Sequence, residues 1–172
     1  MFENVEISLD ELPGADGLEW QPLDAGFRSR MIVERLITIA FLLAGGVIIS
    51  LIPPVPYYSA LFLILGIIIA AVAMLAWPFL AIPRMGFVVR DKDLVYRSGV
   101  FWRRVTAIPY NRIQLVETSS SPLDRRYNLA SLKVFTAGGA SGDLKIDGLG
   151  KEHAEQLRAL ILEKAGASIE SD

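Results

Sequence analysis

The feature that most constrains this chain is a stretch of 48 consecutive residues, from Leu36 to Pro83, that contains no Asp, Glu, Lys or Arg. Of these residues 37 are hydrophobic, against a hydrophobic content of 52% for the whole 172-residue chain. Without this stretch, the remaining sequence has the composition of an ordinary globular domain. The sequence therefore excludes a soluble single-domain enzyme and predicts a small membrane protein with a soluble part.

Three prolines divide the apolar stretch into two runs, Leu36–Ile52 and Ala60–Ile82, because they prevent one continuous helix. The second run would reach about 35 Å as a helix, enough for a hydrocarbon core of roughly 30 Å, and the first becomes long enough if it begins at Met31. We therefore predict a transmembrane hairpin over residues 31–83, with helices at about 31–52 and 60–82.

Two alternatives to this hairpin are a buried core hairpin in a soluble protein and a cleaved signal peptide. The rest of the chain is too short to cover two uncharged helices. A signal peptide would begin with a short basic segment, whereas residues 1–27 hold seven acids and no base. Both alternatives are disfavoured.

Positive charge lies directly on both sides of the apolar stretch. Arg28, Arg30 and Arg35 precede the first helix, while residues 84–133 carry ten basic and four acidic residues and the connecting loop carries no base. The positive-inside rule then predicts a multi-pass protein of the cytoplasmic membrane with both termini in the cytoplasm. Residues 1–30 are expected to form an acidic cytoplasmic tail and 167–172 a C-terminal tail.

The soluble part, residues 84–166, has the pattern of short strands followed by one helix. Apolar and polar residues alternate or β-branched residues gather in six runs separated by turn residues, namely Phe87–Arg90, Leu94–Arg97, Val100–Ile108, Ile113–Thr118, Leu132–Thr136 and 144–146. Asn128 is expected to adopt a left-handed conformation. An apolar stripe at Ala154, Leu157, Leu160, Ile161 and Ala165 predicts a helix that stops at Gly166. These elements predict an antiparallel sheet or open barrel capped by a C-terminal helix, and thus an α+β membrane protein.

At this point the residues resemble a known family, the bacterial pleckstrin-homology-like (PH-like) membrane proteins of the YdbS type. The resemblance covers about residues 20–165, including Trp20, and is carried by the order of two apolar helices and then Gly86–Val89, Ser98-Gly99, Ile108-Pro109, Arg112–Gln114, Leu129–Leu132 and Thr136–Gly138. It implies a split-barrel PH fold on the cytoplasmic face of the membrane. It implies no established reaction or ligand.

The candidate site residues are basic and aromatic. The basic ones lie in the first predicted strands and turns, and are Arg84, Arg90, Lys92, Arg97, Arg103, Arg104 and Arg112. They either contact anionic headgroups or form a solvated face that only sets topology. Arg90, Lys92 and Arg97 also loosely resemble the basic cluster that eukaryotic PH domains use for phosphoinositides.

The aromatic candidates are Phe101 and Trp102, beside Arg103 and Arg104. They would dip into the membrane interface or stack in a groove of a partner, unless at least one belongs to the core. Asp124–Tyr127 is expected to make local pairs on a loop.

The sequence offers little for catalysis. There is no cysteine, one histidine, and no glycine loop that precedes a helix as a phosphate loop does. Both apolar runs lack the ionisable residues that mark transport or proton relay. We therefore predict no enzymatic activity, no cofactor and no metal site.

The leading hypothesis is a membrane-anchored interaction module that assembles with a second copy or a related PH-like membrane protein, without nucleic acid. One alternative is a lipid-sensing or envelope-stress factor whose basic face binds anionic headgroups. Another is an accessory subunit of a transport or enzyme complex.

Overall fold

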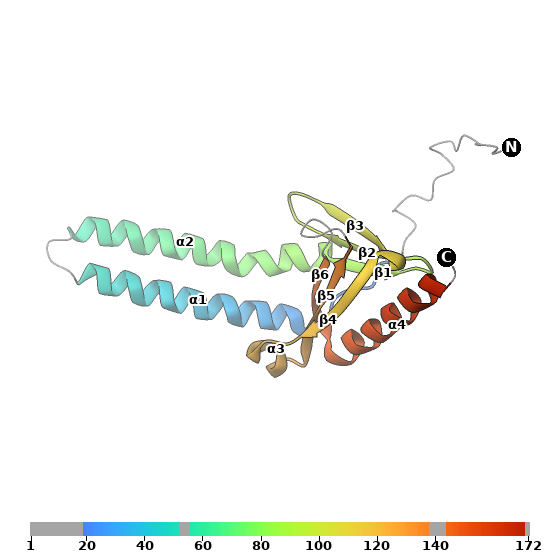
Figure 1. Ribbon diagram of the computed structural model, residues 1–172. Helices are drawn as coiled ribbons and strands as arrows, with labels where there is room; N and C mark the ends of the chain where they lie inside the picture. The colour runs from blue at the N-terminus through green and yellow to red at the C-terminus, as the bar shows by residue number, and fades with distance from the viewer. Residues whose placement is uncertain (1–18, 52–55, 138–143, 171–172) are drawn as a thin grey trace, which may run out of the picture.

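The protein consists of a long helical hairpin and a small β domain at its base (Figure 1). The computed structural model describes residues 19–51, 56–137 and 144–170. The hairpin comprises α1 (Gly26–Ser50) and α2 (Tyr57–Ala81), which lie side by side. Close packing is possible at Gly46, where an added Cβ would lie 3.0 Å from Ile67 Cδ1. Small residues let membrane helices approach closely, as at Gly46, whereas an added Cβ at Gly45 or Gly66 would meet nothing within 4 Å.

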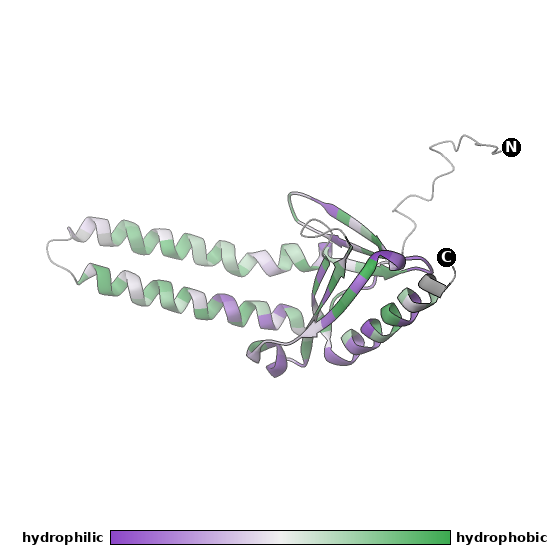
Figure 2. Cartoon of the chain, viewed as in Figure 1, coloured by the Kyte–Doolittle hydropathy of each residue, from purple (hydrophilic) through white to green (hydrophobic). Residues whose placement is uncertain are grey.

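Both helices are long and apolar enough to cross a membrane, and their large apolar side chains are mostly exposed. Figure 2 shows that hydrophobic residues predominate in the part of the hairpin far from the β domain, while hydrophilic residues appear on α1 close to the domain. The alternative of a buried core hairpin is therefore wrong, because the hairpin lies outside the domain core.

The β domain contains two antiparallel sheets of three strands each. The first sheet has the order β1 (Gly86–Val89), β2 (Asp93–Ser98) and β3 (Arg104–Pro109), and the second has the order β4 (Ile113–Ser119), β5 (Leu129–Thr136) and β6 (Leu144–Gly150). Short helices join these parts: η3 (Ile82–Arg84) links α2 to β1, η4 (Tyr110–Arg112) links the sheets, and α3 (Pro122–Arg126) links β4 to β5. The six antiparallel strands agree with the prediction.

The C-terminal helix α4 (Lys151–Glu170) packs on the second sheet and on η4. Its buried residues Ala154, Leu157, Ile161 and Ala165 are those of the predicted stripe, whereas Leu160 is more than a third exposed. They join a core that includes the fully buried Leu94, Leu132, Val134 and Ile146. The helix passes through Gly166 and so extends beyond the predicted end of the domain, because a glycine without a competing turn can continue a helix at modest cost.

Several predicted bounds differ from those in the structure. The third strand begins at Arg104 rather than at Val100, because Val100–Arg103 forms the turn after β2. Strands β5 and β6 are longer than predicted, and Asn128 has the expected left-handed conformation, with φ of 54°. The predicted loop at 53–59 is only partly described, and α2 begins at Tyr57 rather than at Ala60, because no proline follows Pro56 to stop the helix. Most of the predicted loop at 137–142, residues 1–18 of the N-terminal tail and 171–172 lie outside the described residues.

The largest difference is at the start of α1. The helix begins at Gly26, five residues before the predicted Met31, and its residue Phe27 is buried in the domain core with Leu23. Before it, Gln21 pairs with Phe87 of β1 through backbone hydrogen bonds of 2.9 and 3.2 Å. Residues 20–30 are therefore part of the folded domain rather than of a tail.

Candidate functional site

The strand register decides which predicted site residues lie near the hairpin. Strand β1 leaves α2 through η3, so its first residue, Gly86, lies at the hairpin end of the first sheet (Figure 1). Gly86 pairs with Arg97 and Val89 pairs with Leu94. The turn between β2 and β3 therefore lies beside the hairpin, and the turn between β1 and β2 lies at the opposite end of the sheet.

Four of the predicted basic residues, Arg84, Arg97, Arg103 and Arg104, line one hollow at the hairpin end. The other three are elsewhere. Arg90 and Lys92 belong to the opposite turn, about 17 Å along β2 from Arg97, and Arg90 Nε lies 3.4 Å from Asp93 Oδ1. Arg112 lies in η4. The structure thus does not bring together Arg90, Lys92 and Arg97.

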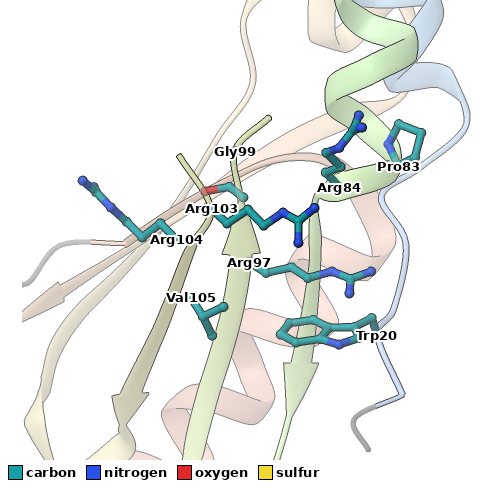
Figure 3. Close-up of a pocket in the computed structure, with 9 residues that line it drawn as sticks. Trp20, Pro83, Arg84, Arg97, Gly99, Arg103, Arg104 and Val105 are labelled. Atoms are coloured by element: carbon teal, nitrogen blue, oxygen red, sulfur yellow. The ribbon is translucent and has the colours of Figure 1, made fainter. Parts of the chain in front are cut away.

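The hollow, which we call the arginine pocket, has a volume of about 390 Å³. Its lining residues are Trp20, Pro83, Arg84, Arg97, Ser98, Gly99, Arg103, Arg104 and Val105. Figure 3 shows Arg97 and Arg103 extending toward the side on which Trp20 lies, whereas Arg104 extends away from it. Arg84 Nη1 donates to the carbonyl oxygen of Leu80. Among the described residues that line the pocket there are four cations and no anion.

The floor of the pocket is a stacked pair of side chains. The Arg97 guanidinium carbon lies 4.4 Å from the centroid of the Trp20 ring, the geometry of a cation–π contact. Arg97 Nε is buried and has no hydrogen-bond partner among the described residues. Sequence analysis placed Trp20 within the resemblance but not in the site, because its contact with Arg97 depends on the pairing of Gln21 with β1.

Gly99 shapes the rim of the pocket. Its φ of 106° lies in a region that side chains rarely adopt, and an added Cβ would lie 1.9 Å from the carbonyl oxygen of Trp102. Only glycine therefore allows this turn, which the Ser98-Gly99 pair had indicated. The turn projects Phe101 and Trp102 outward.

The two aromatic candidates are both exposed, with 77% of Phe101 and 87% of Trp102 accessible. The expectation that at least one belongs to the core is therefore wrong. Their environment is the hairpin: the Phe101 ring lies 6.0 Å from the ring of Trp77 in α2 and 6.4 Å from the ring of Trp102. An aromatic cluster thus extends from the side of α2 to the tip of the β2–β3 turn.

An ion pair joins the domain to α1 on the other side of the hairpin. Arg30 Nε donates to Asp124 Oδ1 at 2.8 Å, and Asp124 also completes a capping box with Ser121 at the start of α3. Burial alone would raise the pKa of Asp124, but hydrogen bonds from Ser121 and the Arg30 guanidinium together hold it below the ordinary value of 3.8. The local pairing expected for Asp124–Tyr127 therefore also includes a contact with the hairpin.

A second hollow, of about 560 Å³, lies between residues 21–24, β1, the end of β6 and α4. It is lined mainly by apolar side chains, and His153, the one histidine of the chain, lies at it with an exposed side chain. Within residues 19–51, 56–137 and 144–170, no group of three His, Asp or Glu side chains is placed to hold a metal ion.

Comparisons with known proteins agree with this architecture. The family model described as "Bacterial PH domain" matches residues 31–165. The UPF0699 transmembrane protein YdbS of Bacillus subtilis (strain 168) is 36% identical over 73 residues, which are 42% of this chain and 44% of that protein. The match therefore spans less than half of the relative. No solved structure matches the chain.

The family match includes most of both apolar helices and nearly all of the β domain, which confirms the resemblance found in the sequence. Similarity to a transmembrane protein and the two exposed apolar helices together identify a membrane protein with two candidate spans. The chain belongs to the bacterial PH domain family.

Proposed function

We propose that this protein is a non-enzymatic, membrane-anchored PH-like module whose β2–β3 turn rests on the anionic cytoplasmic leaflet. The observation that carries the proposal is the contact between Phe101 and Trp77, because it places the tip of the turn beside a membrane helix. In this proposal the contact holds the end of the domain that carries the β2–β3 turn toward the bilayer.

The position of this contact along α2 corresponds to the level of the membrane interface. Trp77 precedes Arg84 by seven residues, so it lies about 10 Å further along the helix toward the bilayer. Trp side chains favour the headgroup level. Phe101 and Trp102 lie near Trp77, and interfacial burial would remove their large apolar surfaces from water.

Charge favours the same orientation. Near an anionic leaflet each Lys or Arg contributes about 1 kcal/mol of attraction. The four arginines of the arginine pocket lie at the hairpin end, and Arg28, Arg30 and Arg35 lie at the base of α1. Basic flanks on both helices support an orientation with both termini in the cytoplasm, as the positive-inside rule predicts.

The contact is testable because the chain has no natural cysteine. In the Trp102→Cys variant, the new cysteine of the full-length protein is labelled with a polarity-sensitive fluorophore. The labelled protein is then placed in nanodiscs of neutral or anionic lipid. Lys92→Cys is the matched control, because it lies in the turn at the opposite end of the same sheet. We expect a blue shift and quenching by brominated lipid at position 102 only, larger with anionic lipid. Equal emission from both positions in both lipids would refute the proposal.

Orientation requires a separate measurement. Ser59→Cys, near the N-terminus of α2, and Lys92→Cys are treated with an impermeant maleimide in intact bacterial cells. We expect labelling at 59 and none at 92 until the cells are opened. Labelling at 92 alone would place the β domain outside and remove the basis for a cytoplasmic-leaflet contact.

Assembly with a second copy or a related PH-like membrane protein stays a prediction. This assembly can be tested by purifying the full-length protein in mild detergent and measuring the mass of the particle and the identity of co-eluting chains. A stoichiometric second chain would support the assembly.

A further inference from the structure

We propose that the arginine pocket binds one phosphate group, presented by an anionic phospholipid headgroup or by a soluble phosphate ester. This inference rests on the proposed function for the nearness of the leaflet, but it adds a specific site. A general attraction between basic residues and a charged surface needs no pocket, whereas a phosphate site needs donors that converge.

The first argument is the state of Arg97. Its stacking on Trp20 fixes the guanidinium plane, which leaves the edge of the guanidinium to donate hydrogen bonds. Its Nε is buried without a partner among the described residues. A buried donor without a partner is unfavourable, so this end of Arg97 is not fully satisfied in the structure. Arg97 also lines the pocket, and planar guanidinium groups suit phosphate because they can donate two parallel hydrogen bonds.

The second argument is the charge around the pocket. Arg103 extends from the β2–β3 turn toward the same side as Arg97, and Arg84 lies at the adjoining end of η3 (Figure 3). No described acidic side chain lines the pocket, so the lining cations have no compensating charge there. A group with one or two negative charges would supply it.

The third argument is the position of the pocket. Pro83 and Arg84, at the end of the second membrane helix, form part of its wall, and the turn that carries Phe101 and Trp102 forms another. In the proposed orientation this wall lies at the headgroup layer. A volume of about 390 Å³ is within the range of small-ligand sites, so a phosphate with part of its headgroup fits.

The test uses full-length protein in uncharged detergent with Trp77→Phe and Trp102→Phe, so that Trp20 is the remaining tryptophan of the three in the chain. Its fluorescence is followed during titration with inorganic phosphate, glycerol 3-phosphate and dihexanoyl phosphatidic acid, with sodium chloride held in excess. We expect saturable changes with at least one phosphate compound. Binding of the lipid alone identifies a headgroup site, and equal binding of glycerol phosphate identifies a soluble ester as a sufficient ligand.

Substitutions then separate the pocket from general charge. Arg103→Gln lies in an exposed turn, and Arg112→Gln is its matched control because it removes the same charge from an exposed residue of η4 that does not line the pocket. We expect Arg97→Gln and Arg103→Gln to weaken binding about tenfold, as loss of a charge-assisted hydrogen bond does. Arg112→Gln should change binding less than about threefold.

Two results would overturn the inference. One is equal weakening by Arg103→Gln and Arg112→Gln, which indicates net charge alone. The other is no saturable response to any of the three compounds. In either case the fluorophore at position 102 can still respond to anionic nanodiscs, so the leaflet contact would stand while the phosphate site would not. Failure of the leaflet contact with retained phosphate binding would leave a soluble ester as the ligand.

Discussion

The ion pair between Arg30 and Asp124 is expected to hold the β domain in one orientation on the hairpin. Arg30 lies near the start of α1, and Asp124 belongs to the capping box that begins α3. Replacing Arg30 by Gln removes the charge and the guanidinium that bonds Asp124, while the helix keeps a polar side chain at this position. We predict that this substitution destabilises the folded protein.

The size of the expected loss of stability follows from how much of each side chain is buried. The side chains of Arg30 and Asp124 are 21% and 12% exposed. Exposed pairs contribute about 0–1 kcal/mol, and breaking a fully buried pair costs about 3–5 kcal/mol. Asp124 keeps its hydrogen bonds from Ser121 in the variant. We therefore expect a loss of about 1–2 kcal/mol, or a fall in Tm of about 3–6 °C.

The assay is thermal unfolding of the full chain in neutral detergent, followed by near-ultraviolet circular dichroism. Arg126→Gln, on the exposed face of α3, removes the same charge without breaking the pair and should cost under about 0.5 kcal/mol. A double-mutant cycle of Arg30→Gln and Asp124→Asn should give a coupling of about 1 kcal/mol. Equal shifts for Arg30→Gln and Arg126→Gln would refute the reasoning, as would additive effects in the cycle.

The same pair predicts a pH dependence. The pKa of Asp124 is lower in the folded protein than its ordinary value of 3.8, so the contribution of this carboxylate is fully present above that value. It is lost as the pH falls through the folded pKa. The difference in Tm between the natural protein and Arg30→Gln should therefore shrink at acid pH. A difference that grows on acidification would contradict this assignment.

The remaining predictions concern packing and ionisation. Gly148→Ala should lower the free energy of unfolding by about 3 kcal/mol, because φ at Gly148 is 77° and an added Cβ would lie 2.3 Å from the Phe27 ring. Gly166→Ala, in open space on α4, should raise the free energy of unfolding by about 0.5–1 kcal/mol in the same melting assay. Ile161→Ala should lower the free energy of unfolding by about 2–5 kcal/mol and Leu160→Ala by under about 1 kcal/mol, because of these two residues Ile161 is the buried one. Equal losses of stability in the two variants would contradict the packing of α4. Burial, followed by the charge of nearby aspartates, raises the pKa values of Tyr96 and Tyr110 to about 12. Their contribution to stability is present below pH 10 and lost as the pH rises through about 12, so phenolate absorbance should show two tyrosines that ionise near pH 12.

The elements that depend on local pattern were predictable. The two apolar helices follow from length and the absence of charge, and the prolines place the break between them. Alternation of apolar and polar residues indicated the strands, and Asn128 indicated its own left-handed conformation. These signals lie within a few neighbouring residues, so they hold without knowledge of the rest of the fold.

The start of α1 was not predictable in this way. The seven acids among residues 1–27 give the segment the composition of a solvated tail, which hides Leu23 and Phe27. Both are buried only because β1 and β6 provide partners far along the chain, through Gln21 with Phe87 and Asp24 N with the Gly148 carbonyl oxygen. A nonlocal contact therefore determines where the membrane helix begins.

The site shows the same division. Sequence analysis identified every arginine of the pocket, but it grouped Arg97 loosely with Arg90 and Lys92. The pairing of Gly86 with Arg97 separates them, because it sends the two turns of the first sheet to opposite ends. The composition of the sequence identifies the candidate residues, and the strand register determines which of them lie close together.

The hairpin consequently determines the orientation of the β domain as well as its location. Contacts join the domain to both helices: Arg30 of α1 pairs with Asp124 of α3, and Trp77 of α2 meets Phe101 of the β2–β3 turn. Figure 1 shows α3 beside α1 and the β2–β3 turn beside α2, so the contacts lie on different sides of the hairpin. A single contact would let the domain roll about the hairpin axis, whereas two separated contacts oppose that roll. The arginine pocket lies next to the second contact, so in the orientation that we propose the ion pair at the first contact would also help to keep the pocket at the level of the headgroups.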